Sequence, residues 1–95
     1  MDYADFSQLA KTTIRGMYDR IPAKYHEGFE DLFIGGELRL AVEDLVGGLH
    51  RFDTAVTPVE RENLSQMLTY LGEPVSKLDG IRVEGEGHGE SVSST

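Results

Sequence analysis

Residues 33–49 read FIGGELRLAVEDLVGGL, and this segment sets where the chain turns between two of its helices. Gly35-Gly36 is expected to end one amphipathic helix, because glycine adopts the left-handed conformation of a helix C-terminus without steric cost. The next helix of the chain then begins near Glu37. The segment also carries acidic residues that an apolar core does not require. It therefore indicates a small helical protein that presents an acidic surface.

Apolar residues recur every three or four positions on the N-terminal side of this segment, which is the period of one helical face. We expect a first helix from Tyr3 to Ile21, stopped by Pro22, and a second helix from about Ala23. The inward side chains of the first helix are expected to be Tyr3, Phe6, Ala10, Ile14, Met17 and Ile21. Those of the second are Tyr25, Phe29, Leu32 and Phe33.

The same period continues through the segment itself and predicts a third helix from about Glu37 to Phe52. Its inward side chains are expected to be Leu38, Ala41, Val42, Leu45, Leu49 and Phe52. Gly47-Gly48 interrupts it, and each glycine weakens a helix by about 1 kcal/mol relative to alanine. We therefore expect a kink at this point, or the close approach of another helix.

A fourth helix opens with Thr57-Pro58-Val59-Glu60, a capping box with proline at the first helical position. It continues with an apolar stripe and is closed by Gly72 and Pro74; the stripe is Leu64, Met67, Leu68 and Leu71. Beyond Pro74, Val75 and residues 78–83 are expected to form a short turn and an extended arm laid on the domain. The residues from Glu84 to Thr95 contain almost nothing to bury, so we expect them to be flexible.

These elements predict an all-α fold, a small bundle of about four helices built from two helical hairpins. The expected helical domain spans residues 1–73, and residues 74–95 form a C-terminal arm and a flexible acidic tail. Ninety-five residues correspond to one domain that can build a single core but cannot bury most of its surface.

The charge of the chain is strongly acidic, with 9 basic against 17 acidic residues and a net charge of −8. Most of it lies between residues 25 and 60, where eight acids face two arginines. This composition argues against binding of nucleic acid or an anionic membrane, and favours a basic protein partner. The chain has no cysteine, and its start lacks the basic and apolar regions of a signal peptide. We therefore expect a cytoplasmic protein.

Motifs for chemistry are weak throughout the sequence. His26-Glu27-Gly28-Phe29-Glu30 begins like the zinc motif HExxH, but glutamate stands where the second histidine ligand is required. Gly85-Glu86-Gly87-His88-Gly89 lacks the third glycine and the following helix of a dinucleotide-binding loop. Glu43 and Asp44 are adjacent on a helix, so they diverge by about 100° and do not converge on one substrate atom. We predict no enzyme activity, no metal and no cofactor.

The acids on the outer helix faces are the better candidates for function. On the second helix they are Glu27, Glu30 and Asp31, and on the third a helical projection puts Leu40 between Glu43, Asp44 and Gly47. An apolar anchor ringed by carboxylates suits docking of a basic protein. The alternative is that Leu40 packs beneath the first helix or the arm, and that the acids only keep the protein soluble. The predicted partner-binding residues are Glu27, Glu30, Asp31, Glu37, Leu40, Glu43, Asp44 and Asp53.

One helix of this chain resembles that of a known family. Gly36, Glu37, Ala41, Glu43 and Leu45 match in order a Gly-Glu-x-x-x-Ala-x-Glu-x-Leu helix. Such a helix follows a short helical hairpin in the MafI-like immunity proteins of bacterial polymorphic toxin systems. The similarity extends over residues 21–72, a little over half of the chain.

The resemblance implies an intracellular protein that binds the C-terminal toxic domain of a cognate secreted protein, often a nuclease, and blocks its active site or substrate path. The predicted partner is thus a cognate toxin domain, which we expect to be basic. The alternative from the residues alone is a small helical adaptor or regulator that recognises a peptide in the groove between its helix pairs, or a basic protein.

Overall fold

The computed structural model describes residues 1–85 of the chain and confirms the predicted all-α fold. Within these residues it has four α-helices and three 3₁₀ turns. The helices are α1 (Tyr3–Arg15), α2 (His26–Ile34), α3 (Leu38–Arg51) and α4 (Pro58–Leu71). The 3₁₀ turns are η1 (Tyr18–Arg20), η2 (Ala23–Tyr25) and η3 (Val75–Leu78).

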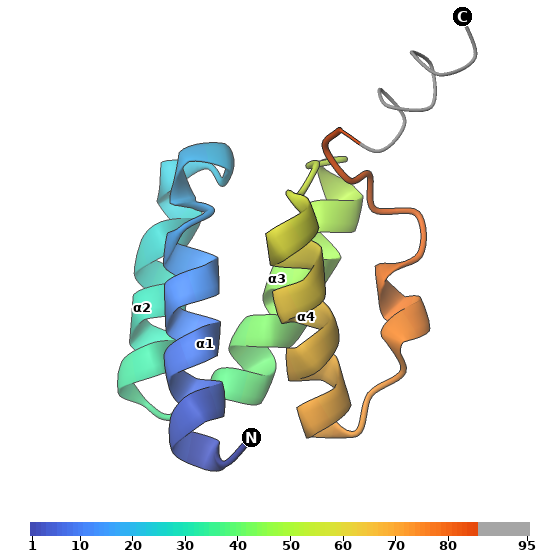
Figure 1. Cartoon of the computed structure of the whole chain (residues 1–95). Helices are drawn as coiled ribbons and strands as arrows, with labels where there is room; N and C mark the ends of the chain where they lie inside the picture. Colours follow the sequence, from blue (N-terminus) through green and yellow to red (C-terminus); the bar gives the residue numbers. More distant parts are fainter. Residues whose placement is uncertain (86–95) are drawn as a thin grey trace, which may run out of the picture.

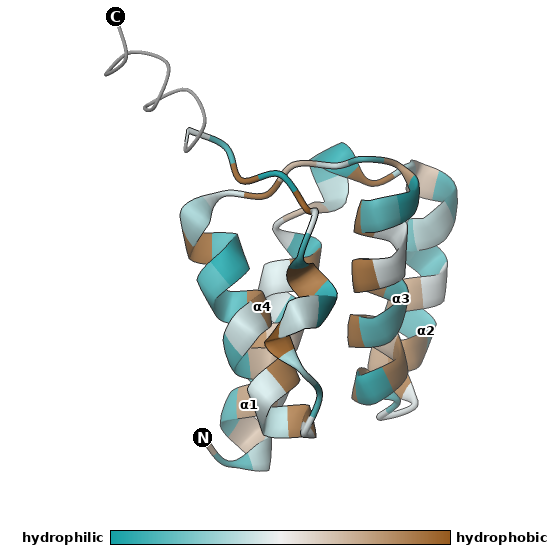
Figure 2. Ribbon diagram, turned by 90° about the vertical axis from the view of Figure 1, so that its right-hand side faces the viewer, coloured by the Kyte–Doolittle hydropathy of each residue, from teal (hydrophilic) through white to brown (hydrophobic). Residues whose placement is uncertain are grey.

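The helices run alternately up and down, and the arm after α4 turns back along α4 (Figure 1). Helix α1 contacts both α3 and α4, and α2 contacts α3. Figure 2 shows apolar and polar positions alternating turn by turn along α3. Helix α3 is central to the packing, because it contacts α1, α2 and α4 and has six buried residues.

One apolar core joins all four helices and the arm. Its most deeply buried large side chains are Phe6, Ile14, Met17, Leu45, Leu64, Met67, Leu68 and Leu78. Most of these positions were predicted from helical spacing. Three residues that were predicted to face the core are exposed instead. Two of them, Tyr25 and Phe52, are 37% and 46% exposed. Tyr3, also predicted to face inward, is exposed as well.

Helix α1 ends earlier than its apolar spacing predicted. The α-helix stops at Arg15 with Gly16 as its C-cap, and not at Ile21. The chain then tightens, because the amide of Met17 donates to the carbonyl of Ile14, three residues back. Met17 is nevertheless completely buried. Apolar spacing of three or four residues fits an α-helix and a 3₁₀ turn equally well, so the pattern continued although the helix did not.

Helix α3 begins and ends close to its predicted limits, and Gly47-Gly48 does not break it. The helix runs without interruption from Leu38 to Arg51. A Cβ atom added at Gly47 or at Gly48 would meet no atom within 4 Å, so no other helix approaches closely there. The turn before α3 is as predicted, with Gly36 at a φ of 72°.

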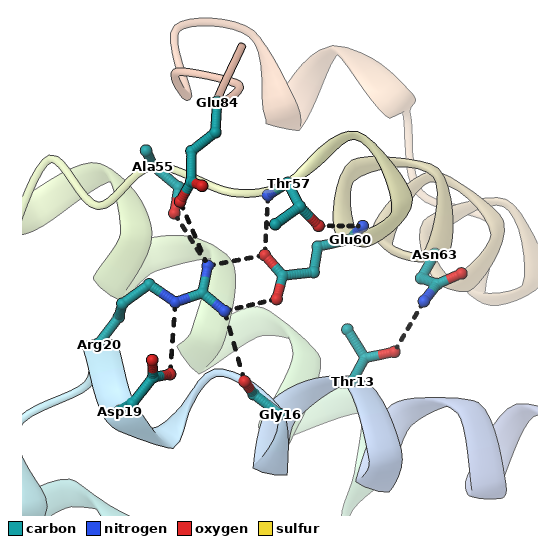
Figure 3. A network of polar contacts seen from close by, with 9 residues as sticks. All are labelled: Thr13, Gly16, Asp19, Arg20, Ala55, Thr57, Glu60, Asn63 and Glu84. Atoms are coloured by element: carbon teal, nitrogen blue, oxygen red, sulfur yellow. Dashed lines mark hydrogen bonds and ion pairs between the residues drawn. The ribbon is translucent and has the colours of Figure 1, made fainter.

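Helix α4 has the predicted capping box, and its glutamate makes a second, long-range contact (Figure 3). The hydroxyl of Thr57 accepts from the amide of Glu60, and the Glu60 carboxylate accepts from the amide of Thr57. The same carboxylate binds the guanidinium of Arg20 through two contacts of 2.5 and 2.8 Å. Arg20 also donates to the carbonyls of Gly16 and Ala55.

The arm packs on the domain as predicted. The side chain of Leu78 is buried, and Val83 forms an isolated parallel bridge with Val56. The amide of Glu84 donates to the Val56 carbonyl at 2.7 Å, so Glu84 is held in place although we predicted that the flexible tail begins there. The rest of the predicted tail, from residue 86 onward, lies outside the described residues. The division into residues 1–73 and 74–95 stays a prediction.

Replacing Glu60 by alanine tests how much its carboxylate stabilises the fold through its contacts with the Thr57 amide and the Arg20 guanidinium. The Glu60→Ala variant loses the hydrogen bond from the Thr57 amide to the Glu60 carboxylate, and it leaves Arg20, whose side chain is only 25% exposed, without its main counter-charge. We expect a loss of about 2–3 kcal/mol in the free energy of unfolding, measured by urea denaturation. The control is Glu62→Ala, also on α4, where the carboxylate bonds only to Gln66 among the described residues. It should change stability by less than about 0.5 kcal/mol.

Candidate functional site

The eight predicted partner-binding residues divide into those that face outward and those that are used inside the molecule. Glu30 belongs to the second group, although we expected its carboxylate to be available to a partner. Its carboxylate accepts two hydrogen bonds from Arg15, at 2.7 and 2.9 Å, and a third from the hydroxyl of Tyr18 at 2.9 Å. These bonds join α2 to the end of α1, so Glu30 is a structural residue.

The electrostatics of this cluster follow from the same contacts. The hydrogen bonds from Arg15 and then Tyr18 lower the pKa of Glu30 to about 2. Burial, together with the hydrogen bond to Glu30, raises the pKa of Tyr18 to about 12. Glu30 is therefore charged at neutral pH, but this charge is already compensated by Arg15 and has little to offer a partner.

Glu27 and Asp31 keep the arrangement that the sequence predicted. Both side chains lie on the exposed face of α2, one turn apart. Neither makes a side-chain hydrogen bond or an ion pair with another residue of the described part of the chain. Like charges at this spacing repel one another weakly, so a cation from a partner would relieve the repulsion.

On α3 the side chain of Leu40 is exposed, as the helical projection predicted. Its side chain is 45% exposed, so it is not covered by α1 or by the arm. Glu37 is exposed at the N-cap of α3 and Asp44 lies one turn after Leu40; within residues 1–85 neither carboxylate has an ion pair. Glu43 is half-buried and 3.9 Å from Arg39. The exposed acids of α3 are thus Glu37 and Asp44, with Leu40 between them.

Asp53 lies away from these acids and holds the arm. Its backbone φ is 51°, and its carboxylate and carbonyl accept hydrogen bonds from Arg82 at 3.2 and 2.7 Å. The carboxylate is still 77% exposed, but it shares its charge with an arginine of the same molecule. We assign to Asp53 the role of a contact between the end of α3 and the arm, which its position in the sequence did not suggest.

The sequence analysis missed a groove of about 270 Å³ between the η2–α2 segment and the C-terminal half of α3. Its apolar wall is formed by Ile21, Pro22, Phe29, Leu45 and Leu49. The half-exposed rings of Tyr25 and Phe52 also line it, with their centroids 5.9 Å apart. Both aromatic residues were predicted to be core, but they are partly exposed and line the groove. No sequence signal distinguishes them from fully buried aromatic residues.

Polar groups border the groove. Asp44, Gly48 and Arg51 all lie on its α3 side, at helical positions i, i+4 and i+7. The guanidinium of Arg51 lies over the ring of Phe52, 5.4 Å from its centroid. Arg20 also lines the groove, but its charge is compensated by Glu60. The groove is therefore an apolar pocket open to solvent with one carboxylate and one guanidinium beside it.

The histidines of the described residues have structural partners. His26 stacks on Tyr18 with ring centroids 4.0 Å apart, and its Nε2 donates to the carbonyl of Ile21. Nε2 of His50 donates to the carbonyl of Lys77, which ties the arm to α3. Across residues 1–85 no three His, Asp or Glu side chains are grouped so that they could hold a metal ion. None of the described helices has both the length and the apolar character required to cross a membrane.

Comparison with known proteins does not extend these observations. No family model, no curated protein and no solved structure matches the chain. The assignment of function therefore depends on the residues and the geometry described above.

The structural role of Glu30 predicts a specific pH dependence. Its pKa is lowered on folding, so its contribution to stability is present above its usual pKa of 4.5 and is lost as the pH falls towards about 2. The Glu30→Gln variant should be less stable than the wild type at neutral pH, and the difference should shrink across this range. Thermal unfolding at several pH values measures it. A difference that stays constant down to the lowest pH would contradict the ionic origin.

Proposed function

We propose that this chain is an immunity protein that neutralises a cognate bacterial toxin domain by binding it tightly inside the producing cell. Two features support the proposal. The motif that carries the family resemblance begins at Gly36 and continues into α3, which is the helix that exposes Leu40. The carboxylates on either side, Glu37 and Asp44, are exposed. The exposure of Leu40 between unpaired acids is the observation that carries the proposal.

The chemistry of such a surface suits inhibition of a nuclease. A toxin that cleaves nucleic acid is basic where it grips phosphates, and the carboxylates of α3 and of Glu27 and Asp31 on α2 can occupy that basic surface. The net charge of −8 speeds encounter, and burial of Leu40 slows dissociation. The acids thus act mainly on the association rate, whereas the apolar anchor holds the complex together.

A second candidate function is a small helical adaptor or regulator that binds a peptide. The groove beside Tyr25 and Phe52 favours it, because an apolar pocket with polar groups at its edge is the usual form of a peptide-binding site. The two functions differ in genetic context. A gene for a large secreted toxin directly upstream supports immunity, whereas an isolated gene or an operon of metabolic enzymes supports an adaptor.

The direct test is co-expression of this chain with the C-terminal domain of the toxin encoded upstream. We expect a one-to-one complex by size-exclusion chromatography, and survival of cells that the toxin domain alone would kill. A toxin domain that remains active and unbound in the presence of excess protein would rule out the immunity function.

Substitutions on α3 locate the binding surface. Asp44→Lys should slow association with the toxin domain, and the effect should fade at high salt because the steering charges are screened. Leu40→Ala should mainly speed dissociation and weaken binding by more than about 1 kcal/mol. Both are measured by surface plasmon resonance at two salt concentrations.

The matched control is Glu62→Lys, which makes the same charge change on an exposed position of α4. It should alter the association rate less than Asp44→Lys does. Equal slowing by the two variants would mean that only the net charge of the protein matters, and that α3 is not the binding surface.

A further inference from the structure

We propose that the groove between η2, α2 and α3 receives one large apolar side chain of a partner polypeptide, and that a lysine or arginine next to that side chain pairs with Asp44. This inference deepens the proposed function and rests on it for the identity of the partner. It adds a second anchor point to the surface that contains Leu40. The partner's chemistry follows from three properties of the groove.

The first property is its size and apolar lining. Small-molecule sites typically have volumes of about 300–1,000 Å³, so a groove of about 270 Å³ suits a single large side chain better than a whole ligand. Phe29, Leu45 and Leu49 form its inner wall, and each is less than one tenth exposed. Tyr25 and Phe52 supply aromatic edges against which a ring or a branched aliphatic chain can pack.

The second property is the absence of a side chain at Gly48. This glycine lines the groove from α3, and a Cβ added there would meet no protein atom within 4 Å. The helix tolerates glycine here at a cost of about 1 kcal/mol relative to alanine. Neither packing nor backbone conformation within the described chain requires glycine at this position, because the helix is regular and the neighbouring space is open. Its effect is to keep the groove open to an incoming group.

The third property is the arrangement of charge. Asp44 is one helical turn from Gly48 and one turn from Leu40, so its carboxylate lies between the groove and the exposed leucine. Within residues 1–85 it has no ion pair, and a cation of the partner would supply one.

Arg51 lies one turn beyond Gly48, and Lys24 is placed 5.3 Å from the ring centroid of Tyr25. These two cations can donate hydrogen bonds to backbone carbonyls, which every polypeptide offers. A polypeptide segment with an apolar side chain beside a basic residue can fill the groove and pair with Asp44, while its backbone carbonyls accept hydrogen bonds from Arg51.

The proposal can be tested without the toxin, by titrating the isotope-labelled protein with blocked dipeptide amides and following backbone amide shifts by NMR. The probe is acetyl-Lys-Phe-amide at millimolar concentration. We expect saturable shifts centred on Gly48, Asp44 and Thr54, which line the groove. Acetyl-Lys-Ala-amide, without the ring, should give none. Acetyl-Glu-Phe-amide should bind more weakly at low salt.

Two glycine substitutions provide a matched pair. Gly48→Leu fills the groove and should weaken binding of acetyl-Lys-Phe-amide at least about ten-fold. Gly47→Leu makes the same change one residue away, where the added side chain also has open space but does not line the groove, and should leave binding unchanged. Both variants replace a helix glycine, so circular dichroism and thermal unfolding should show them folded and at least as stable as the wild type.

Several outcomes would overturn the proposal. They are unchanged probe binding in Gly48→Leu, shifts centred away from the groove or no saturable shifts at all, and a preference for the glutamate probe. Failure of the immunity function gives a different result, because the protein would then bind the probe in the groove but not the toxin domain. Where the toxin complex does form, Gly48→Leu should weaken it at least about ten-fold.

Discussion

A single partly buried guanidinium, that of Arg20, joins the first half of the chain to the second. It binds the carboxylate that caps α4, the carbonyl at the end of α1 and the carbonyl of Ala55 before α4, and Glu84 of the arm is 3.9 Å away. A cation in this position must be compensated, because burying an unpaired charge is costly. The hydrogen bonds to Glu60 raise the pKa of Arg20 above its usual value, although burial by itself would lower it. Arg20 is the last residue of η1 and also lines the groove, so this contact lies beside the groove.

The acids of the middle of the chain serve two purposes that a count of charges does not separate. Glu30, Asp53 and Glu60 compensate Arg15, Arg82 and Arg20, so they hold elements of this molecule together. Glu27, Asp31, Glu37 and Asp44 have no such partner among the described residues and remain exposed. A carboxylate that already accepts charged hydrogen bonds adds little to the attraction of a partner. The set of unpaired exposed acids is therefore smaller than the sequence suggested, and two of them, Glu37 and Asp44, flank Leu40 on α3.

Exposed aromatic rings and a glycine inside a helix both lower the stability of a small domain. Tyr25 and Phe52 would contribute more to stability if fully buried, and Gly48 weakens the helix that contains it. These features occur together at one groove, next to an unpaired carboxylate. Residues that each lower the stability of the isolated domain often occur together at a binding site. A bound group can cover the exposed rings, fill the space beside the glycine and pair with the carboxylate.

The all-α class, the capping box, the turn at Gly35-Gly36 and most core positions followed from the sequence by itself. These features depend on local periodicity and on backbone preferences that act over three or four residues. The end of α1, the internal pairing of Glu30 and Asp53, and the half-exposed rings that form the groove were decided only by the tertiary structure. The ion pairs depend on which distant residue lies opposite, Arg15 opposite Glu30 and Arg82 opposite Asp53, whereas α1 ends at a local 3₁₀ turn that apolar spacing does not distinguish from an α-helix. The spacing of residues along one helix does not predict these tertiary contacts.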